Sequence, residues 1–279
     1  MSVWEAILLG VVQGITEFLP ISSSGHLILV PWLLGWGEPG LMFSVGVHLG
    51  TLAAVIIYFR RDLFSMALAL PKGIASGQPL RDPTSRLALI IVVGSIPAAI
   101  VGLTAGTVLE DFFHAGGGGN LAIALVAVML IVVALALGWA ERVANHRRPI
   151  DDIRMKDGVM IGLAQALALF PGVSRSGGTI TAGLFLGFRR EAAARFSFLL
   201  GVPAVLGAGL FEVRNLIDNG LAGGELPVFA AGILTSAIVG YLSIAFLLRF
   251  LVRHSTLIFI VYRIAFGLLV LSLLALGFR

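Results

Sequence analysis

The chain has 279 residues, of which 58% are hydrophobic and 12% are charged, and it contains no cysteine. Its mean hydropathy of +1.02 excludes an ordinary soluble domain, since such domains carry about twice this charged fraction. The lack of cysteine excludes disulfides, cysteine nucleophiles and thiolate metal sites, and the net charge of +4 matters less than where the basic residues lie. Long apolar runs recur throughout, so we expect a single all-α polytopic membrane domain over residues 1–279.

Six apolar segments are long enough, or nearly so, to cross a membrane, since a span needs about 20 residues. In chain order they are Leu41–Phe59, Leu87–Leu109, Asn120–Ala140, Phe196–Phe211, Leu226–Leu248 and Thr256–Phe278.

Four further apolar segments are too short to span, and they flank two polar breaks, "LPISSSG" and "FPGVSRSGG". Two half-helices around such a break predict a re-entrant hairpin, because non-helical backbone at membrane depth must line protein or a wet cavity. The first predicted hairpin comprises Ala6–Thr16 and Leu27–Trp36, and the second comprises Gly158–Phe170 and Ile180–Phe188.

The two halves of the chain repeat. A shift of 152 residues places Gly10–Leu27 on Gly162–Thr179 with six identities in eighteen positions. Each half, 1–150 and 151–279, then reads as a hairpin followed by three spans. Because three is odd, the second repeat is expected to be inverted in the membrane.

The basic residues test this topology independently. Fifteen of the nineteen lie on one predicted face, two lie on the other, and Arg175 and Arg263 lie at membrane depth. Because basic residues favour the cytoplasm, both termini are predicted to face outward and the two hairpin tips to meet near the midplane.

The tips bring polar groups together inside the membrane. An intramembrane carboxylate or guanidinium is costly unless paired, so Glu17 and Arg175 are candidate functional residues. Gln13 lies four residues from Glu17 and shares its helix face. The helix that follows each break directs its free N–H groups and positive dipole end into the break. With an arginine fork and several hydroxyls, this arrangement predicts a site for phosphate or diphosphate, where Glu17 and His26 supply acid/base capacity and a nearby serine could act as nucleophile.

The two breaks resemble the two signature motifs of the bacterial undecaprenyl-diphosphate phosphatases of the BacA type. "VVQGITEFLPISSSGH" (Val11–His26) matches E/Q-x-x-x-E running into P-x-S-S-x-G-H, and "PGVSRSGGT" (Pro171–Thr179) matches P-G-x-S-R-S-x-x-T. The spacing and the hydropathy profile are similar over essentially the whole chain.

This resemblance implies an integral membrane enzyme of the bacterial inner membrane that removes the terminal phosphate of undecaprenyl diphosphate, recycles the carrier lipid for cell-wall synthesis and confers bacitracin resistance. It implies an inverted repeat with a site opening outward. The expected catalytic residues are Glu17, His26, Ser23 and Arg175. The residues expected around the phosphates are Gln13, Ser22, Ser24, Gly25, Ser174, Ser176, Gly177 and Thr179.

The resemblance also implies a divalent cation, usually magnesium, with Glu17 as the candidate ligand. Many members have glutamate where this chain has Gln13, and losing one carboxylate weakens a metal site built on both positions, because magnesium prefers carboxylate and water oxygens. The expected partners are a polyprenyl diphosphate and the bilayer, with no nucleic acid and a homodimer left open.

Several interpretations stay open at this point. Ser23, a water or His26 could attack the phosphorus, with His26 relaying a proton under the orientation of Glu17. Ser22 and Ser24 could bind phosphate or only cap helices. For His48 we favour a structural role over lining the pocket, and for Arg263 we favour snorkelling or pairing with a carbonyl near an interface. "HAGGGGN" (His114–Asn120) is expected to be a flexible outer loop.

A secondary transporter or lipid flippase is the main alternative, because inverted repeats with broken helices at the midplane are common in transporters. The local chemistry favours an enzyme, since a carrier needs a binding site but not an acid/base pair beside a serine.

Overall fold

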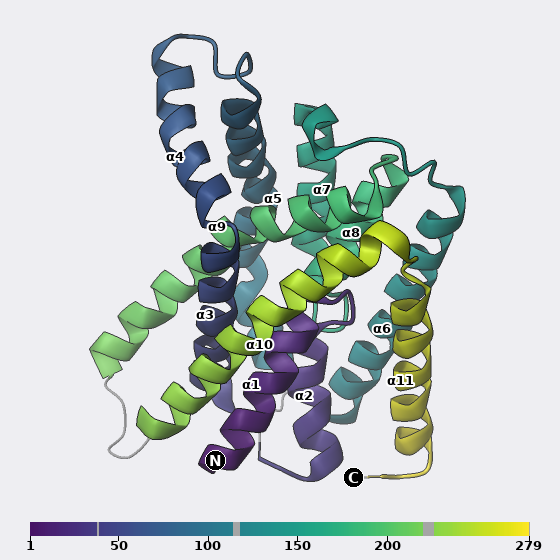
Figure 1. The fold of residues 1–279 in the computed structure, drawn as a ribbon. Helices are drawn as coiled ribbons and strands as arrows, with labels where there is room; N and C mark the ends of the chain where they lie inside the picture. Colours follow the sequence, from purple (N-terminus) through teal and green to yellow (C-terminus); the bar gives the residue numbers. More distant parts are fainter. Residues whose placement is uncertain (38, 114–117, 220–225, 279) are drawn as a thin grey trace.

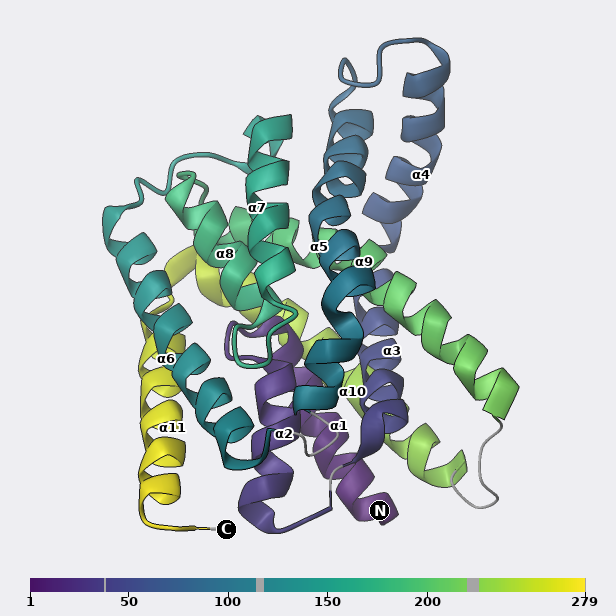
Figure 2. The same ribbon diagram turned by 180° about the vertical axis from the view of Figure 1, so that it is seen from behind.

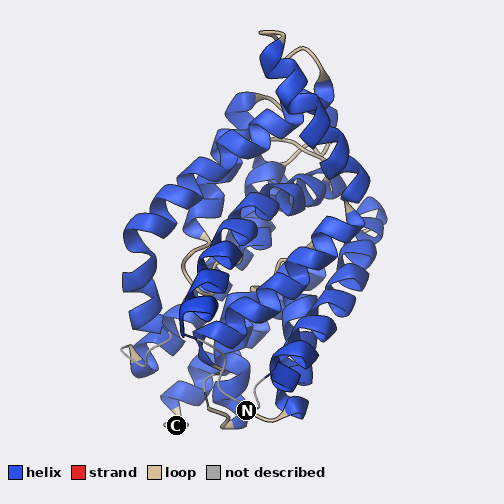
Figure 3. Cartoon of the chain, turned by 90° about the vertical axis from the view of Figure 1, so that its left-hand side faces the viewer, coloured by secondary structure: helices blue, strands red, loops and turns tan. Residues whose placement is uncertain are grey.

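The computed structural model describes residues 1–37, 39–113, 118–219 and 226–278. In this part of the chain every named regular element is a helix, and loops connect the helices, as Figure 3 shows. The elements are α1 (Val3–Phe18), α2 (Ser23–Leu34), α3 (Gly40–Tyr58), α4 (Arg60–Ala75), α5 (Pro83–Phe113), α6 (Gly119–Val143), the 3-10 helix η1 (Ile150–Asp152), α7 (Met155–Leu167), α8 (Arg175–Phe185), α9 (Arg190–Asn219), α10 (Leu226–Arg253) and α11 (Leu257–Ala275).

The two predicted hairpins are present as α1–α2 and α7–α8. Figures 1 and 2 show that α1 and α2 come from the end of the molecule that holds both termini, whereas α7 and α8 come from the opposite end. The turn between α1 and α2 and the turn between α7 and α8 meet in the middle of the bundle. The Oγ of Ser176 donates to the carbonyl of Leu19 at 3.1 Å, so the two turns are in direct contact.

Four of the six predicted spans are confirmed as helices long and apolar enough to cross a membrane, namely those in α5, α6, α10 and α11. The span predicted from Leu41 lies in α3, which bends by 78° into α4 after Tyr58. The segment predicted from Phe196 lies in α9, whose side chains from residue 210 onward are outside the described part. The helix α4 is not predicted from the sequence, and it packs against α5. Of the loop predicted at "HAGGGGN", residues 114–117 lie outside the described residues, and α6 begins at Gly119.

Arg263 on α11 lies at the point where the turns meet and is 0% exposed. Its guanidinium donates to the carbonyl of Pro20 at 3.1 Å in the first turn and to that of Gly172 at 2.8 Å in the second. Further bonds reach the carbonyls of Leu130, Met129 and Val173. Pairing with carbonyls is thus confirmed, but snorkelling to an interface is wrong, because the side chain binds both turns together inside the bundle.

Candidate active site

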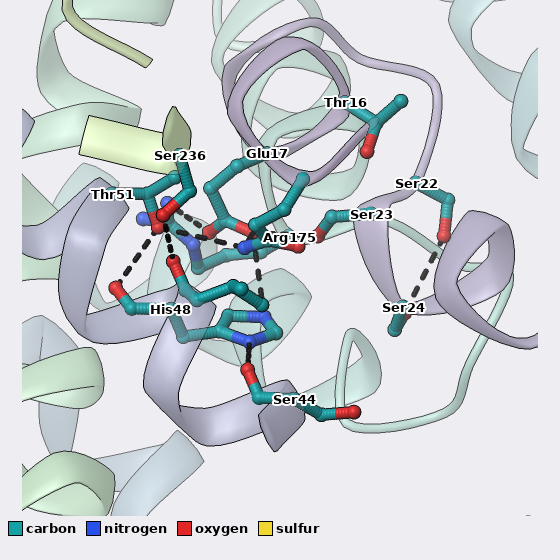
Figure 4. Close-up of polar contacts among 12 residues, drawn as sticks. Thr16, Glu17, Ser22, Ser23, Ser24, Ser44, His48, Thr51, Arg175 and Ser236 are labelled. Carbon is teal, nitrogen blue, oxygen red and sulfur yellow. Dashed lines mark hydrogen bonds and ion pairs between the residues drawn. The ribbon is translucent and has the colours of Figure 1, made fainter. Parts of the chain in front are cut away.

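The carboxylate of Glu17 is the centre of a buried polar cluster, and its side chain is 5% exposed. Its Oε1 accepts a hydrogen bond from Nη2 of Arg175 at 2.9 Å. Its Oε2 accepts from the hydroxyl of Ser23 at 2.5 Å and from the amide of Gln13 at 3.1 Å. Figure 4 shows Ser23 and Arg175 reaching the Glu17 carboxylate from different elements. The sequence prediction that Gln13, Glu17, Ser23 and Arg175 come together is therefore reproduced by the structure.

These residues meet because each lies at the end of a half-helix. Glu17 is in the last turn of α1, Ser23 is the first residue of α2 and Arg175 is the first residue of α8. The positive dipole ends of α2 and α8 therefore lie beside the carboxylate, and this end of a helix favours an anion. The arrangement suits a second, larger anion next to Glu17.

Arg175 keeps donors that the protein does not use. A guanidinium has five N–H groups. One is donated to Glu17 and another to the carbonyl of Ser197 at 3.3 Å, while Nε has no protein hydrogen-bond partner. The planar fork can therefore hold Glu17 and still offer N–H groups to phosphate oxygens.

The guanidinium of Arg175 lies directly against Gly201 of α9, so that a Cβ at position 201 would overlap it. We expect Gly201→Ala to displace Arg175 and to lower the phosphate release implied by the sequence resemblance by about 10²-fold, since small misplacements of a positioning group cost rates of this order. The measurement is phosphate release by the purified variant. Gly207→Ala is the matched control, because a Cβ on this glycine of the same helix would meet nothing within 4 Å, and the variant should retain activity.

The serines that open α2 and α8 are helix caps with the same geometry in both turns. Ser22 has φ +79° and its Oγ accepts from Gly25 N, while Ser174 has φ +74° and its Oγ accepts from Gly177 N. Positive φ is uncommon for a residue with a Cβ and costs about 1–3 kcal/mol, which neighbouring contacts must offset. Both serines are nearly fully buried. Their observed role is capping, and phosphate binding by Ser22, Ser174, Gly25 and Gly177 stays a prediction.

The remaining predicted phosphate ligands already have protein partners. Thr179 is fully buried and bonds the carbonyl of Arg175 at 2.7 Å and the hydroxyl of Ser197 at 2.6 Å. Ser24 lies 3.5 Å from Ser22 through the two hydroxyl oxygens, away from the Glu17 cluster in Figure 4. The corresponding pair in the second turn, Ser174 and Ser176, is 3.2 Å apart. These side chains bond within and between the two turns and to α9. None of the hydrogen bonds described for them reaches the Glu17 carboxylate.

His26 lies on the other side of α2, against α11. Its Nδ1 is 2.7 Å from the carbonyl of Ser22 and its Nε2 is 2.6 Å from the hydroxyl of Tyr262. Because a carbonyl can only accept, Nδ1 carries the hydrogen, and in the neutral ring Nε2 accepts from Tyr262. The ring also stacks on Phe266 at 4.8 Å between centroids. Both ring nitrogens thus have hydrogen-bond partners other than Glu17. The prediction that Glu17 orients His26 is therefore wrong.

His48 and Thr51 of α3 also belong to the cluster. For His48, lining the pocket was the less favoured interpretation of the sequence, and Thr51 was not predicted. His48 Nε2 lies 3.5 Å from Glu17 Oε2, and Thr51 Oγ1 lies 3.5 Å from the Gln13 amide. The structural interpretation favoured for His48 is therefore incomplete, because its ring faces the carboxylate. The only signal in the sequence was a histidine in the middle of an apolar span.

A narrow crevice opens from the cluster between α1, α3 and α9. Glu17, Thr51 and Arg175 supply the polar part of its wall. The rest of its wall is apolar and consists of Phe18, Leu52, Val55, Phe198, Gly201, Val202 and Val205. Charged and apolar groups thus line the same narrow crevice beside the ion pair.

The residues present do not fit a magnesium site of the protein's own. Magnesium takes near-octahedral oxygen ligands, usually carboxylates, waters and substrate phosphates. Both oxygens of Glu17 are engaged, its neighbour is the amide Gln13, and the described residues contain no group of three His, Asp or Glu close enough to hold an ion. In this structure Glu17 is therefore an ion-pair partner and not a metal ligand.

Together, the fold and this site define a polytopic membrane protein with a carboxylate, a guanidinium and a hydroxyl in contact where two broken helices meet. The chain belongs to the family described as bacitracin resistance protein BacA, whose profile matches residues 6–269, and the resemblance noted in the sequence is thereby confirmed. It is 55% identical over 271 residues to the undecaprenyl-diphosphatase of Thermomicrobium roseum, covering 97% of this chain and 98% of the relative. It is 48% identical to that of Geobacter sulfurreducens (98% and 99% covered) and 47% identical to that of Synechococcus elongatus (99% and 95%).

Proposed function

We propose that this protein is a membrane-embedded undecaprenyl-diphosphatase, which hydrolyses undecaprenyl diphosphate to undecaprenyl phosphate and inorganic phosphate. This activity recycles the carrier lipid of cell-wall synthesis and gives resistance to bacitracin. The observation that carries the proposal is that Ser23 and Arg175 both contact the buried carboxylate of Glu17. The family membership favours this function over a transporter or flippase.

In the proposed reaction, Ser23 Oγ attacks the terminal phosphorus while Glu17 Oε2 accepts the serine proton. The bond from that phosphorus to the bridging oxygen breaks, and the oxygen leaves as part of the polyprenyl phosphate. Arg175 and the N-terminal ends of α2 and α8 stabilise the negative charge of the transition state. The serine proton passes from Glu17 to the released polyprenyl phosphate or to solvent, which leaves Glu17 ionised again. A water then attacks the phosphorus of the phosphoserine while Glu17 accepts its proton. The bond to Ser23 Oγ breaks, and Glu17 returns the proton to that oxygen. The short Ser23–Glu17 bond favours this version over direct attack by water or His26.

The lipid chain of the substrate would leave the site along the apolar wall of the α1–α3–α9 crevice. We propose that the two halves, 1–150 and 151–279, form an inverted repeat in the inner membrane, with both termini outside and the site opening outward. The matched geometry of Ser22 and Ser174 and the opposite entry of the two hairpins support this topology. The excess of basic residues at the end that holds the α4–α5 turn supports its orientation.

We further propose that magnesium, where it takes part, binds the diphosphate oxygens of the substrate, and that a homodimer is compatible with the fold. No step of the proposed reaction requires magnesium or a second copy of the chain. Bound to the diphosphate, the ion would neutralise part of its charge.

The function is tested by phosphate release from a polyprenyl diphosphate by detergent-purified protein, with and without magnesium, for the wild type and Ser23→Ala. We expect release by the wild type and a loss of at least about 10³-fold in the variant, because a hydroxyl acting as nucleophile has no substitute in alanine. If Ser23→Ala were as active as the wild type, the nucleophile would be a water and not the serine. A folded wild type that releases no phosphate under either condition would overturn the phosphatase.

A further inference from the structure

The ring of His48 is held in one orientation on α3. Its Nδ1 lies 2.7 Å from the carbonyl of Ser44, which can only accept, so Nδ1 carries a hydrogen. Thr51 Oγ1 donates to the carbonyl of His48 at 2.9 Å and lies within 3.5 Å of the Gln13 amide, which ties this turn of α3 to α1. In the neutral ring, Nε2 is therefore a proton acceptor with a defined direction.

That direction is toward the reacting groups. His48 Nε2 lies 3.5 Å from Glu17 Oε2, the same oxygen that accepts the Ser23 hydroxyl at 2.5 Å. A proton that leaves Ser23 reaches Oε2 first, and the next basic atom beside that oxygen is His48 Nε2. Figure 4 shows Glu17 between Ser23 and His48.

His48 is also the more accessible of the two histidines near the break. Its side chain is 30% exposed, whereas His26 is 3% exposed and has both ring nitrogens engaged by Ser22 and Tyr262. A relay must both receive a proton inside the site and release it to solvent or product. Of these two rings, only that of His48 is partly exposed and has a nitrogen, Nε2, that makes no hydrogen bond to any described residue.

We propose that His48 is a positioning and proton-relay residue that acts through Glu17, which rests on the phosphatase function proposed above. When the Ser23 Oγ–phosphorus bond forms and the bond to the bridging oxygen breaks, the serine proton moves to Glu17 Oε2 and on to His48 Nε2. Glu17 is then ionised again and can accept the proton of the water that cleaves the phosphoserine. It returns this proton to Ser23 Oγ as the serine–phosphorus bond breaks. His48 returns its proton to the released phosphate or to solvent, so that no proton is gained or lost by the enzyme over one cycle.

The test compares kcat and KM for phosphate release by wild type, His48→Ala, His48→Gln and Glu17→Gln, with and without added imidazole. For His48→Ala and His48→Gln we expect kcat to fall by about 10²-fold with KM within about twofold, because an acid/base group contributes to the reaction and not to binding. Imidazole should restore part of the kcat of His48→Ala. Glutamine should not restore it, since an amide can hydrogen-bond but cannot carry the proton.

The matched control is His254→Ala. His254 makes the same bond from Nδ1 to a carbonyl four residues earlier, that of Phe250, but it is exposed at the end of α10 and should leave both constants unchanged. Wild-type kcat in His48→Gln, or a loss confined to KM, would overturn the relay. If His48→Ala does not fold, His48→Gln decides alone. An active wild type with an inactive Glu17→Gln and fully active His48 variants would overturn the relay but keep the phosphatase, whereas an inactive wild type would overturn both.

Discussion

Arg175→Ala is expected to abolish phosphate release, with a fall in kcat/KM of at least about 10³-fold, the scale found when a donor to the transition-state charge or an arginine at a transferring phosphoryl group is removed. Its guanidinium contacts Glu17 at 2.9 Å and retains an Nε without a protein partner. The described residues hold no cluster of metal ligands that could replace its charge. The measurement is release from a polyprenyl diphosphate with and without magnesium.

The loss must be separated from a loss of folding, because removing one partner of a buried ion pair costs about 3–5 kcal/mol. Arg175→Lys keeps the charge but not the fork, so it should fold and still lose most of its activity. Arg189→Ala, an exposed arginine just after α8, is the matched control and should be as active as the wild type. Activity in a folded Arg175→Ala would contradict the assignment, whatever the result for lysine.

The sequence predicted those features that depend on local composition. Half-helices too short to span, separated by Pro/Gly/Ser-rich breaks, were expected to form hairpins, and α1–α2 and α7–α8 have this form. Glu17 and Arg175 could be identified in advance as functional residues because each is too costly at membrane depth without a partner, although their pairing with one another was not predicted. This argument needs no knowledge of which helices are neighbours.

The features that were missed depend on how apolar helices rotate and pack. In a segment that is hydrophobic all round, periodicity does not indicate which face meets the site, so His48 in α3 could not be aimed at Glu17. For the same reason His26 was expected to share a cluster with Glu17, although its ring turns to Tyr262 of α11, 236 residues away. Arg263 was expected near an interface because nothing in its own segment indicates five carbonyl partners elsewhere in the chain.

Arg263→Met is expected to destabilise the protein more than any single change outside the active site. The variant removes the donors to five carbonyls, including that of Pro20 in one turn and that of Gly172 in the other. Each buried polar group left without a partner costs about 1–3 kcal/mol, so a total of about 5 kcal/mol is a conservative expectation. Thermal unfolding of the detergent-purified protein should show a fall in Tm of about 10 °C or more.

Two further variants separate the hydrogen bonds of Arg263 from its positive charge. Arg263→Lys keeps the charge and up to three donors, so its Tm should lie between those of the wild type and Arg263→Met. Arg253→Met changes an exposed arginine at the end of α10 and should leave Tm unchanged. A wild-type Tm in Arg263→Met would show that the turns hold together without this side chain. If instead the expected order of Tm is found and activity falls in the same order, the contact between the two turns keeps Glu17 and Arg175 within hydrogen-bond distance. Each of these residues lies at a helix end beside one of the turns, and the hydrogen bonds of Arg263 fix the position of both turns.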